Sequence, residues 1–311
     1  MIRCPLPLAV AGAVLLAGCG ADDTPPPQVI TTVPPPQPAA ARQPATESGW
    51  QMVWQDEFSG PEIDRTRWGF AVDCWGGGNN ERQCYVDDPR HAAIVDGRLV
   101  ITARAQEHTG PAWPPHMRAS AADPDALATK PFTSAKLVTK GLAAWRYGRI
   151  EVRAQLPQGQ GTWPAIWMLP EDEAYGTWAA SGEIDILEAV NLGVPCATCP
   201  GGRENTILGT LHFGGQWPAN ALLSHEMSAP AVLDGFNTFG VIWEPGRISW
   251  TLNGLVYASA TDNQWWSSGS SADEAPFDQA FHLILNLAIG GNLPEGRGQG
   301  GVSNESFPKQ M

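Results

Sequence analysis

The sequence predicts an all-β domain, and three observations support this prediction. The 311-residue chain contains 14 Trp and 34 Gly, and only 16% of its residues are charged, a composition typical of strands joined by many turns around an aromatic cleft. Apolar and polar residues alternate with the period of two that a strand requires in residues 99–104, 135–139 and 147–156. The pairs Asp96-Gly97 and Asn253-Gly254 separate such segments, as the central residues of β-hairpin turns do. We therefore expect a mainly antiparallel fold.

The first 19 residues predict an export signal. Arg3 precedes an apolar run from about Leu6 to Ala17, which is too short to span a bilayer as a mature helix. The run ends in Leu16-Ala17-Gly18-Cys19, which resembles a bacterial lipobox. This indicates cleavage before Cys19, lipidation of its thiol and an exported protein anchored to a membrane. An ordinary signal peptide with an incidental cysteine is the alternative.

Residues 20–48 are rich in Pro, Thr, Gln and Ala and cannot form a core, so we expect an extended linker there. The folded domain is expected over residues 49–311. The formal net charge of −13, without a basic stripe, argues against nucleic acid and anionic membrane surfaces as partners, whereas a neutral polysaccharide is unaffected by it. We expect a monomer.

Three acidic residues in one apolar segment provide the strongest functional signal. Glu183 and Asp185 share one face of a strand over residues 183–188, and Glu188 is out of phase with them. A β-bulge between Asp185 and Glu188 would bring all three to one face. Two carboxyl groups with different pKa values are what glycoside hydrolysis needs. The alternative is an exposed polar edge strand, but the flanking residues are aromatic and apolar.

The pattern Glu183-x-Asp185-x-x-Glu188 resembles the signature of glycoside hydrolase family 16, in the bulged form of laminarinase-like endo-β-1,3-glucanases. The segment 161–170 (GTWPAIWMLP) before the acids and the segment 209–215 (GTLHFGG) after them agree with this family, and the resemblance runs from about Trp50 to the C-terminus. The resemblance implies a two-sheet antiparallel β-sandwich of the jelly-roll, concanavalin A-like type with a concave substrate cleft.

The resemblance also implies catalytic roles. Glu183 would be the nucleophile, ionised at working pH, and Glu188 the acid/base, with its pKa raised by neighbouring charges. Asp185 would hydrogen-bond the nucleophile and tune both. The implied reaction is retaining endo-hydrolysis of β-1,3-glucan or mixed β-1,3/1,4-glucan, with the two carboxyl groups ~5–5.5 Å apart and no metal in the chemistry.

Sugar-binding positions follow from the same resemblance. Trp163 and Trp167 would stack on sugar rings near the bond that breaks, with core packing as the alternative for each. His212 would lie beside the acid/base, although a lone His is more often a satisfied core residue. The Gly-rich loop over residues 73–85 would bind the non-reducing end, unless its Asn and Gly residues only form a turn. The full set of candidates is Trp163, Trp167, His212, Asn79, Glu81, Trp217, Gln279 and Asn286.

The cysteines suggest two disulfides. Cys196 and Cys199 form a CxxC pair, for which we favour a loop disulfide over a zinc site, because no further ligands follow closely. Cys74 and Cys84 fit a second disulfide across the Gly-rich loop. This assignment leaves Cys19 for the lipid and Cys4 in the removed signal.

Two departures from the family qualify the resemblance. Leu293 stands where the family usually has Trp, so one aromatic wall is lost. The chain also ends at Met311, where the family continues with a final strand. An Asp on that strand commonly helps to bind a structural calcium, together with a residue like Glu57, so calcium is in doubt. The rival functions are a non-catalytic glucan-recognition protein, and a hydrolase or transglycosylase acting on agar, carrageenan or xyloglucan.

Overall fold

The computed structural model describes residues 30–31, 50–298, 300–304 and 307–311. The predicted signal, the lipidation site Cys19 and most of the predicted linker lie outside these residues. None of the helices within them has the length and apolar character that a membrane crossing requires.

The structure consists mainly of strands, which confirms the all-β prediction. The helical elements are short: α1 (Pro115–Arg118), α2 (Asn292–Glu295) and the 3-10 turns η1 (Pro200–Gly202), η2 (Pro230–Leu233) and η3 (Asp262–Gln264). The strands are β1 (Ile30–Thr31), β2 (Gly69–Phe70), β3 (Gln83–Tyr85), β4 (Ala92–Val95), β5 (Arg98–Ala103), β6 (His108–Pro111), β7 (Leu127–Lys130), β8 (Phe132–Ser134), β9 (Lys136–Val138), β10 (Gly148–Ala154), β11 (Thr162–Pro170), β12 (Glu183–Ala189), β13 (Thr206–Gly214), β14 (Asn220–Ser228), β15 (Asn237–Glu244), β16 (Arg247–Leu252), β17 (Leu255–Thr261), β18 (Phe281–Ile289) and β19 (Lys309–Gln310).

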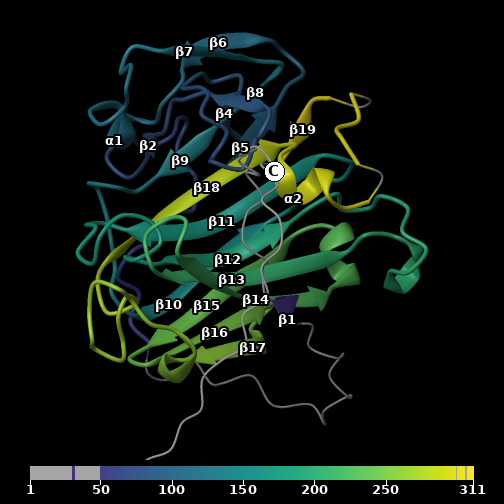
Figure 1. The fold of residues 1–311 in the computed structure, drawn as a ribbon. Coiled ribbons are helices and arrows are strands. Elements are labelled where there is room, and N and C mark those ends of the chain that lie inside the picture. Colours follow the sequence, from purple (N-terminus) through teal and green to yellow (C-terminus); the bar gives the residue numbers. More distant parts are fainter. Residues whose placement is uncertain (1–29, 32–49, 299, 305–306) are drawn as a thin grey trace, which may run out of the picture.

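Two antiparallel sheets form the sandwich (Figure 1). The larger sheet has the order β1-β14-β13-β12-β11-β18-β9-β2, and the smaller has the order β10-β15-β16-β17. Only β1 joins the larger sheet in parallel. Side chains from both sheets fill one core, with Ile184 and Leu187 from β12 and Val241 and Trp250 from the smaller sheet all fully buried. The predicted two-sheet sandwich is confirmed.

The hairpin turns lie where the sequence predicts them. β4 and β5 meet at Asp96-Gly97, and β16 and β17 meet at Asn253-Gly254. All four residues have φ between 50° and 78°, the left-handed conformation that Asn, Asp and Gly adopt most readily. β15, β16 and β17 pair consecutively as a meander.

Residues 106–130 contain paired strands although their sequence shows no strand alternation. β6 and β7 pair there as a hairpin, with α1 between them at the upper end of the molecule in Figure 1. Thr109 and Thr129 lie opposite each other, with their hydroxyl oxygens 2.7 Å apart. The hairpin is held by polar groups rather than by one apolar face, so it lacks the alternation that makes a strand recognisable.

The last residues of the chain pair with the sheet beside the sandwich. β19 runs antiparallel to β5, with Lys309 opposite Ala103. Met311 continues this pairing through two backbone hydrogen bonds of 2.9 Å to Ile101. The prediction that the family's final strand is missing stays a prediction.

Candidate active site

The three acids lie on β12 at the centre of the larger sheet, between β11 and β13, so the edge-strand alternative is wrong. Glu183 pairs with His212 and Asp185 with Thr210, and the register then shifts before Glu188 pairs with Leu208. This shift is the predicted bulge. It returns Glu188 to the face of Glu183 and Asp185, because the extra residue restores the alternation.

Each glutamate accepts a hydrogen bond from an indole. Trp178 donates from Nε1 to Glu183 Oε2 at 2.7 Å, and Trp163 donates from Nε1 to Glu188 Oε1 at 3.0 Å. Trp163 lies on β11 as predicted, whereas Trp178 comes from the loop before β12 and was not among the predicted site residues. Its spacing of five residues before Glu183 was the only signal in the sequence.

His212 and Trp217 extend the site on the other side of Glu183. His212 Nε2 lies 3.4 Å from Asp185 Oδ2 and 3.8 Å from Glu183 Oε1. Its ring centroid is 5.4 Å from that of Trp178, and the largely exposed Trp217 ring is 6.3 Å from Trp178. The structure therefore brings His212 to the acids, and it brings Trp217 to Trp178, the indole that binds Glu183.

Burial raises the pKa values of all three acids. Burial and the charge of Asp185 raise the pKa of Glu183 to about 8. Burial and the charge of Glu188 raise the pKa of Asp185 well above its ordinary value, while a hydrogen bond with Glu183 opposes this shift. Burial raises the pKa of Glu188, not neighbouring charges as predicted, because His212, Trp163 and Arg297 all lower it. The raised pKa of Glu183 disfavours the ionised form that was predicted for the nucleophile, and a neutral Asp185 would favour that form.

A chain of hydrogen bonds connects the cleft floor to the Gly-rich loop. Trp167 Nε1 donates to Asn286 Oδ1 at 2.6 Å, and Asn286 Nδ2 donates to the Tyr85 hydroxyl at 2.9 Å. Tyr85 in turn donates to Glu81 Oε2 at 3.3 Å, and Gln83 Nε2 donates to the same oxygen at 2.6 Å. Asn286, which interrupts the apolar run of β18, thus has both of its partners within the protein.

The remaining predicted sugar-binding residues differ in the hydrogen bonds that they form within the protein. Glu81 is buried in the hydrogen-bond chain, and burial raises the pKa of its carboxyl group. Gln279 donates to the carbonyl oxygens of Ser181 and Pro276, so it holds the segment that enters β12. The side chain of Asn79 is exposed, while its carbonyl accepts the Asn292 N–H at 2.8 Å. Direct sugar contact by these residues stays a prediction.

Both expected cysteine pairs are disulfides in the structure. Cys74–Cys84 closes the Gly-rich loop and Cys196–Cys199 closes the loop after β12. Cys74 also donates its N–H to Pro111 O at 2.7 Å, which attaches the β6–β7 hairpin to the Gly-rich loop.

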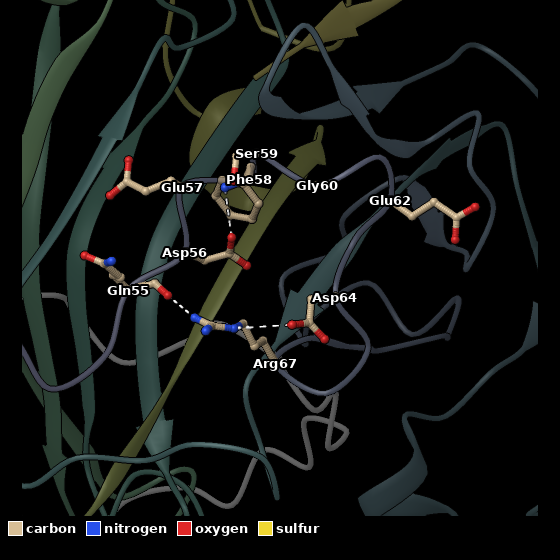
Figure 2. Close-up of a pocket in the computed structure, with 9 residues that line it drawn as sticks. All are labelled: Gln55, Asp56, Glu57, Phe58, Ser59, Gly60, Glu62, Asp64 and Arg67. Carbon is tan, nitrogen blue, oxygen red and sulfur yellow. Dashed lines mark hydrogen bonds and ion pairs between the residues drawn. The ribbon is translucent and has the colours of Figure 1, made fainter.

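Glu57 lies in an acidic cavity, and the possible structural calcium beside it stays a prediction. Figure 2 shows the cavity of about 300 Å³ that contains Glu57, with the carboxylate of Glu57 pointing away from those of Asp56 and Asp64. The Arg67 guanidinium donates to Gln55 O and lies 3.3 Å from Asp64 Oδ2. The positive charge of this side chain therefore already lies against the acidic surface. Within the described part of the chain, Glu57 belongs to no group of three clustered acidic, His or Cys ligands, whereas Ca²⁺ takes six to eight oxygen ligands.

The class of protein follows from these features. A sheet of a two-sheet sandwich carries three buried carboxyl groups on one face, each of its two glutamates binds an indole, and partly exposed aromatic rings flank them. This arrangement defines a β-sandwich glycoside hydrolase. Comparison with known proteins identifies its family: the profile of Glycosyl hydrolases family 16 matches residues 116–300, and the chain belongs to that family.

Individual relatives agree with this assignment. The chain is 37% identical over 262 residues to the glucan endo-1,3-beta-glucosidase A1 of Niallia circulans, a match that covers 80% of this chain and 35% of that longer protein. It is 40% identical over 249 residues to the glucan endo-1,3-beta-glucosidase of Cryptopygus antarcticus, covering 78% of this chain and 82% of the relative. The solved laminarinase of Rhodothermus marinus superposes with a TM-score of 0.67 at 33% identity, covering 84% of this chain and 93% of that one.

Proposed function

We propose that this glycoside hydrolase cleaves internal β-1,3 bonds of β-glucan, including mixed β-1,3/1,4-glucan, with retention of the anomeric configuration. The observation that carries the proposal is the bulge in β12, which puts Glu183, Asp185 and Glu188 on one face. Both relatives described above are named as endo-1,3-β-glucosidases. The formal net charge of −13 also suits a neutral polymer better than a sulfated one.

The proposed reaction has two steps. In the first, the Glu183 carboxylate attacks the anomeric carbon while Glu188 donates a proton to the leaving oxygen, which releases the reducing-side fragment. In the second, Glu188 removes a proton from water, the resulting hydroxide attacks the anomeric carbon, and the bond to Glu183 breaks. The protein ends with the protonation state in which it began.

The protonation of Asp185 decides which glutamate acts in which role. Asp185 is the most deeply buried of the three acids, and burial raises its pKa strongly. A proton on Asp185 removes the negative charge that raises the pKa of Glu183, and it can be donated to Glu183 as a hydrogen bond. The first step requires this arrangement, with Glu183 ionised and Glu188 protonated.

The experiment is reducing-sugar release from laminarin, lichenan and agarose by the protein and its Glu183→Gln variant. We expect release from laminarin by the parent and a loss of at least about 10³-fold in the variant, because the nucleophile is removed. Release from agarose alone would refute the proposed substrate. Binding of laminarin without release by folded parent would indicate a recognition protein instead.

We also propose that the protein is exported and anchored through a lipid on Cys19, and that it acts as a monomer. The support is the sequence of residues 1–19 and the Pro-rich segment that follows it. Detergent phase partitioning of the parent and a Cys19→Ala variant tests the anchor. We expect the parent in the detergent phase and the variant in the aqueous phase, and equal partitioning would refute the anchor.

A further inference from the structure

The loop after α2 places an ion pair beside the acids. Arg297 Nη2 lies 2.5 Å from Glu226 Oε1 on β14. The two side chains are 24% and 19% exposed, so the pair is partly withdrawn from water and less screened than a surface ion pair.

The sheet register aligns this ion pair with Glu188. Leu208 on β13 is the partner of Glu188 on one side and of Glu226 on the other. Residues paired in this way point to the same face of the sheet, and adjacent strands are about 4.8 Å apart. The Cα atoms of Glu188 and Glu226 are therefore roughly 10 Å apart, and the charge of Arg297, held at Glu226, acts on the Glu188 carboxyl group.

Two buried amides fix the backbone of Arg297. Asn191 Nδ2 donates to Pro294 O at 2.8 Å and to Arg297 O at 3.3 Å, and Gln160 Nε2 donates to Arg297 O at 3.4 Å. Asn191 follows Glu188 by three residues, and Gln160 precedes Trp163, the indole donor to Glu188, by three. The loop is thus attached to the segments that hold the acid/base.

Gly298 permits this close approach. It has φ +66°, and a Cβ there would lie 2.7 Å from Gln160 Oε1. A side chain at this position would therefore be strained and would push the loop away from its amide anchor.

We propose that Arg297, held by Glu226, is a positioning residue for the acid/base: its permanent positive charge sets the protonation equilibrium of Glu188. The proposal rests on the proposed function, in which Glu188 is the proton donor. A guanidinium group carries its positive charge in proteins at every working pH. The groups that face Glu188 are Glu183 and Asp185 on β12, Thr210 and His212 on β13, Trp163 on β11, Glu226 on β14 and Arg297.

The test compares Arg297→Met and Arg297→Lys with the parent. The primary measurement is the ¹³C NMR titration of the Glu188 carboxyl group in protein labelled at glutamate, assigned by the signal that Glu188→Gln removes. This measurement does not depend on turnover. The matched control is Arg149→Met, because Arg149 forms a similar ion pair with Glu151 on β10 of the other sheet, at 2.7 Å and with 26% and 32% exposure.

Loss of the positive charge should make Glu188 harder to ionise. We expect its titration midpoint to rise by about 0.5–1 pH unit in Arg297→Met, and to remain near that of the parent in Arg297→Lys and in the control. The alkaline limb of kcat/KM on laminarin should move upward by the same amount. A midpoint in Arg297→Met equal to that of the parent would overturn the proposal.

Glu226→Gln provides a second test should Arg297→Met not fold. This variant removes the negative partner and keeps the positive charge, so the Glu188 midpoint should fall rather than rise, and an unchanged or higher midpoint would contradict the proposal. If the parent does not cleave laminarin but the midpoints shift as described, the proposed function fails and the role of Arg297 stands.

Discussion

The two faces of β12 carry opposite kinds of side chain. On one face Ile184, Ile186 and Leu187 are at most 1% exposed and join the core between the sheets. On the other face Glu183, Asp185 and Glu188 line the cleft. One strand of seven residues therefore contributes strongly both to stability and to the proposed chemistry.

The comparison shows how the two contributions are separated. Burial of the apolar side chains stabilises the fold by roughly 1.5–3 kcal/mol for each large side chain. Burial of three like-charged groups opposes folding, because desolvation and repulsion disfavour their ionised forms. Substitutions on the apolar face should thus reduce the free energy of unfolding and leave kcat nearly unchanged. Substitutions on the acidic face should reduce kcat without reducing the free energy of unfolding.

The largest effect is expected on the acidic face with Glu188→Gln. We expect laminarin hydrolysis to fall by about 10³-fold or more, because the leaving sugar is no longer protonated. Hydrolysis of an aryl β-glucoside oligosaccharide with a dinitrophenolate leaving group should fall far less, because this group leaves without a proton. Equal losses on both substrates would assign Glu188 another role.

The reverse effect is expected on the apolar face with Leu187→Ala. We expect the free energy of unfolding to fall by about 2–5 kcal/mol, measured by urea denaturation with the disulfides intact. The kcat of the remaining folded protein should stay within a few-fold of the parent. A large loss of kcat in protein shown to be folded would mean that the two faces are not separable.

A smaller effect on activity is expected for Asp185→Asn. If Asp185 holds a proton during catalysis, the neutral amide preserves its charge state and a hydrogen-bond donor to Glu183. We expect kcat/KM to fall by about 10- to 100-fold, which corresponds to roughly 1.4–2.7 kcal/mol, and less than in Asp185→Ala. A loss as large as that of Glu183→Gln would show that the ionised form of Asp185 is needed.

The smallest effect concerns the dependence of stability on pH. The pKa of Glu183 is raised in the folded state from 4.5 to about 8, so its contribution to stability is fully present below pH 4.5 and is lost as the pH rises through about 8. Glu183→Gln lacks this titration. Urea denaturation at two pH values one unit apart, both between the two pKa values of Glu183, should show a decline in the parent that exceeds that of the variant by on the order of 1 kcal/mol. Parallel curves would contradict the raised pKa.

The acidic face was predictable from the sequence because it depends on residues that are close together in the chain. The spacing of Glu183, Asp185 and Glu188 within six residues required a bulge, and the Asn253-Gly254 pair defined a hairpin without reference to the rest of the chain. The strands β6 and β7 were missed for the converse reason, because their pairing is polar and shows no alternation.

The surroundings of the acids could not be predicted in the same way. Trp178 reaches Glu183 from an irregular loop, so no period relates the two residues. Arg297 meets Glu226 across 71 positions of sequence, and Asn286 meets Tyr85 across 201. Such pairs depend on how the whole sheet and its loops fold, which spacing alone does not encode.

The hydrogen-bond chain from Trp167 to Glu81 has a consequence for how new specificities can arise on this scaffold. Its members come from β11, β18, β3 and the Gly-rich loop, so a loop transplanted from another enzyme without a matching tyrosine would leave an asparagine amide unpaired beneath the cleft. Grafts of the Gly-rich loop should succeed only when Asn286, its acceptor Tyr85 and the Tyr85 acceptor Glu81 are exchanged together. Trp167, Asn286, Tyr85 and Glu81 should therefore be inherited together. Recombination that separates them should be selected against, even where each parent residue is compatible with the fold.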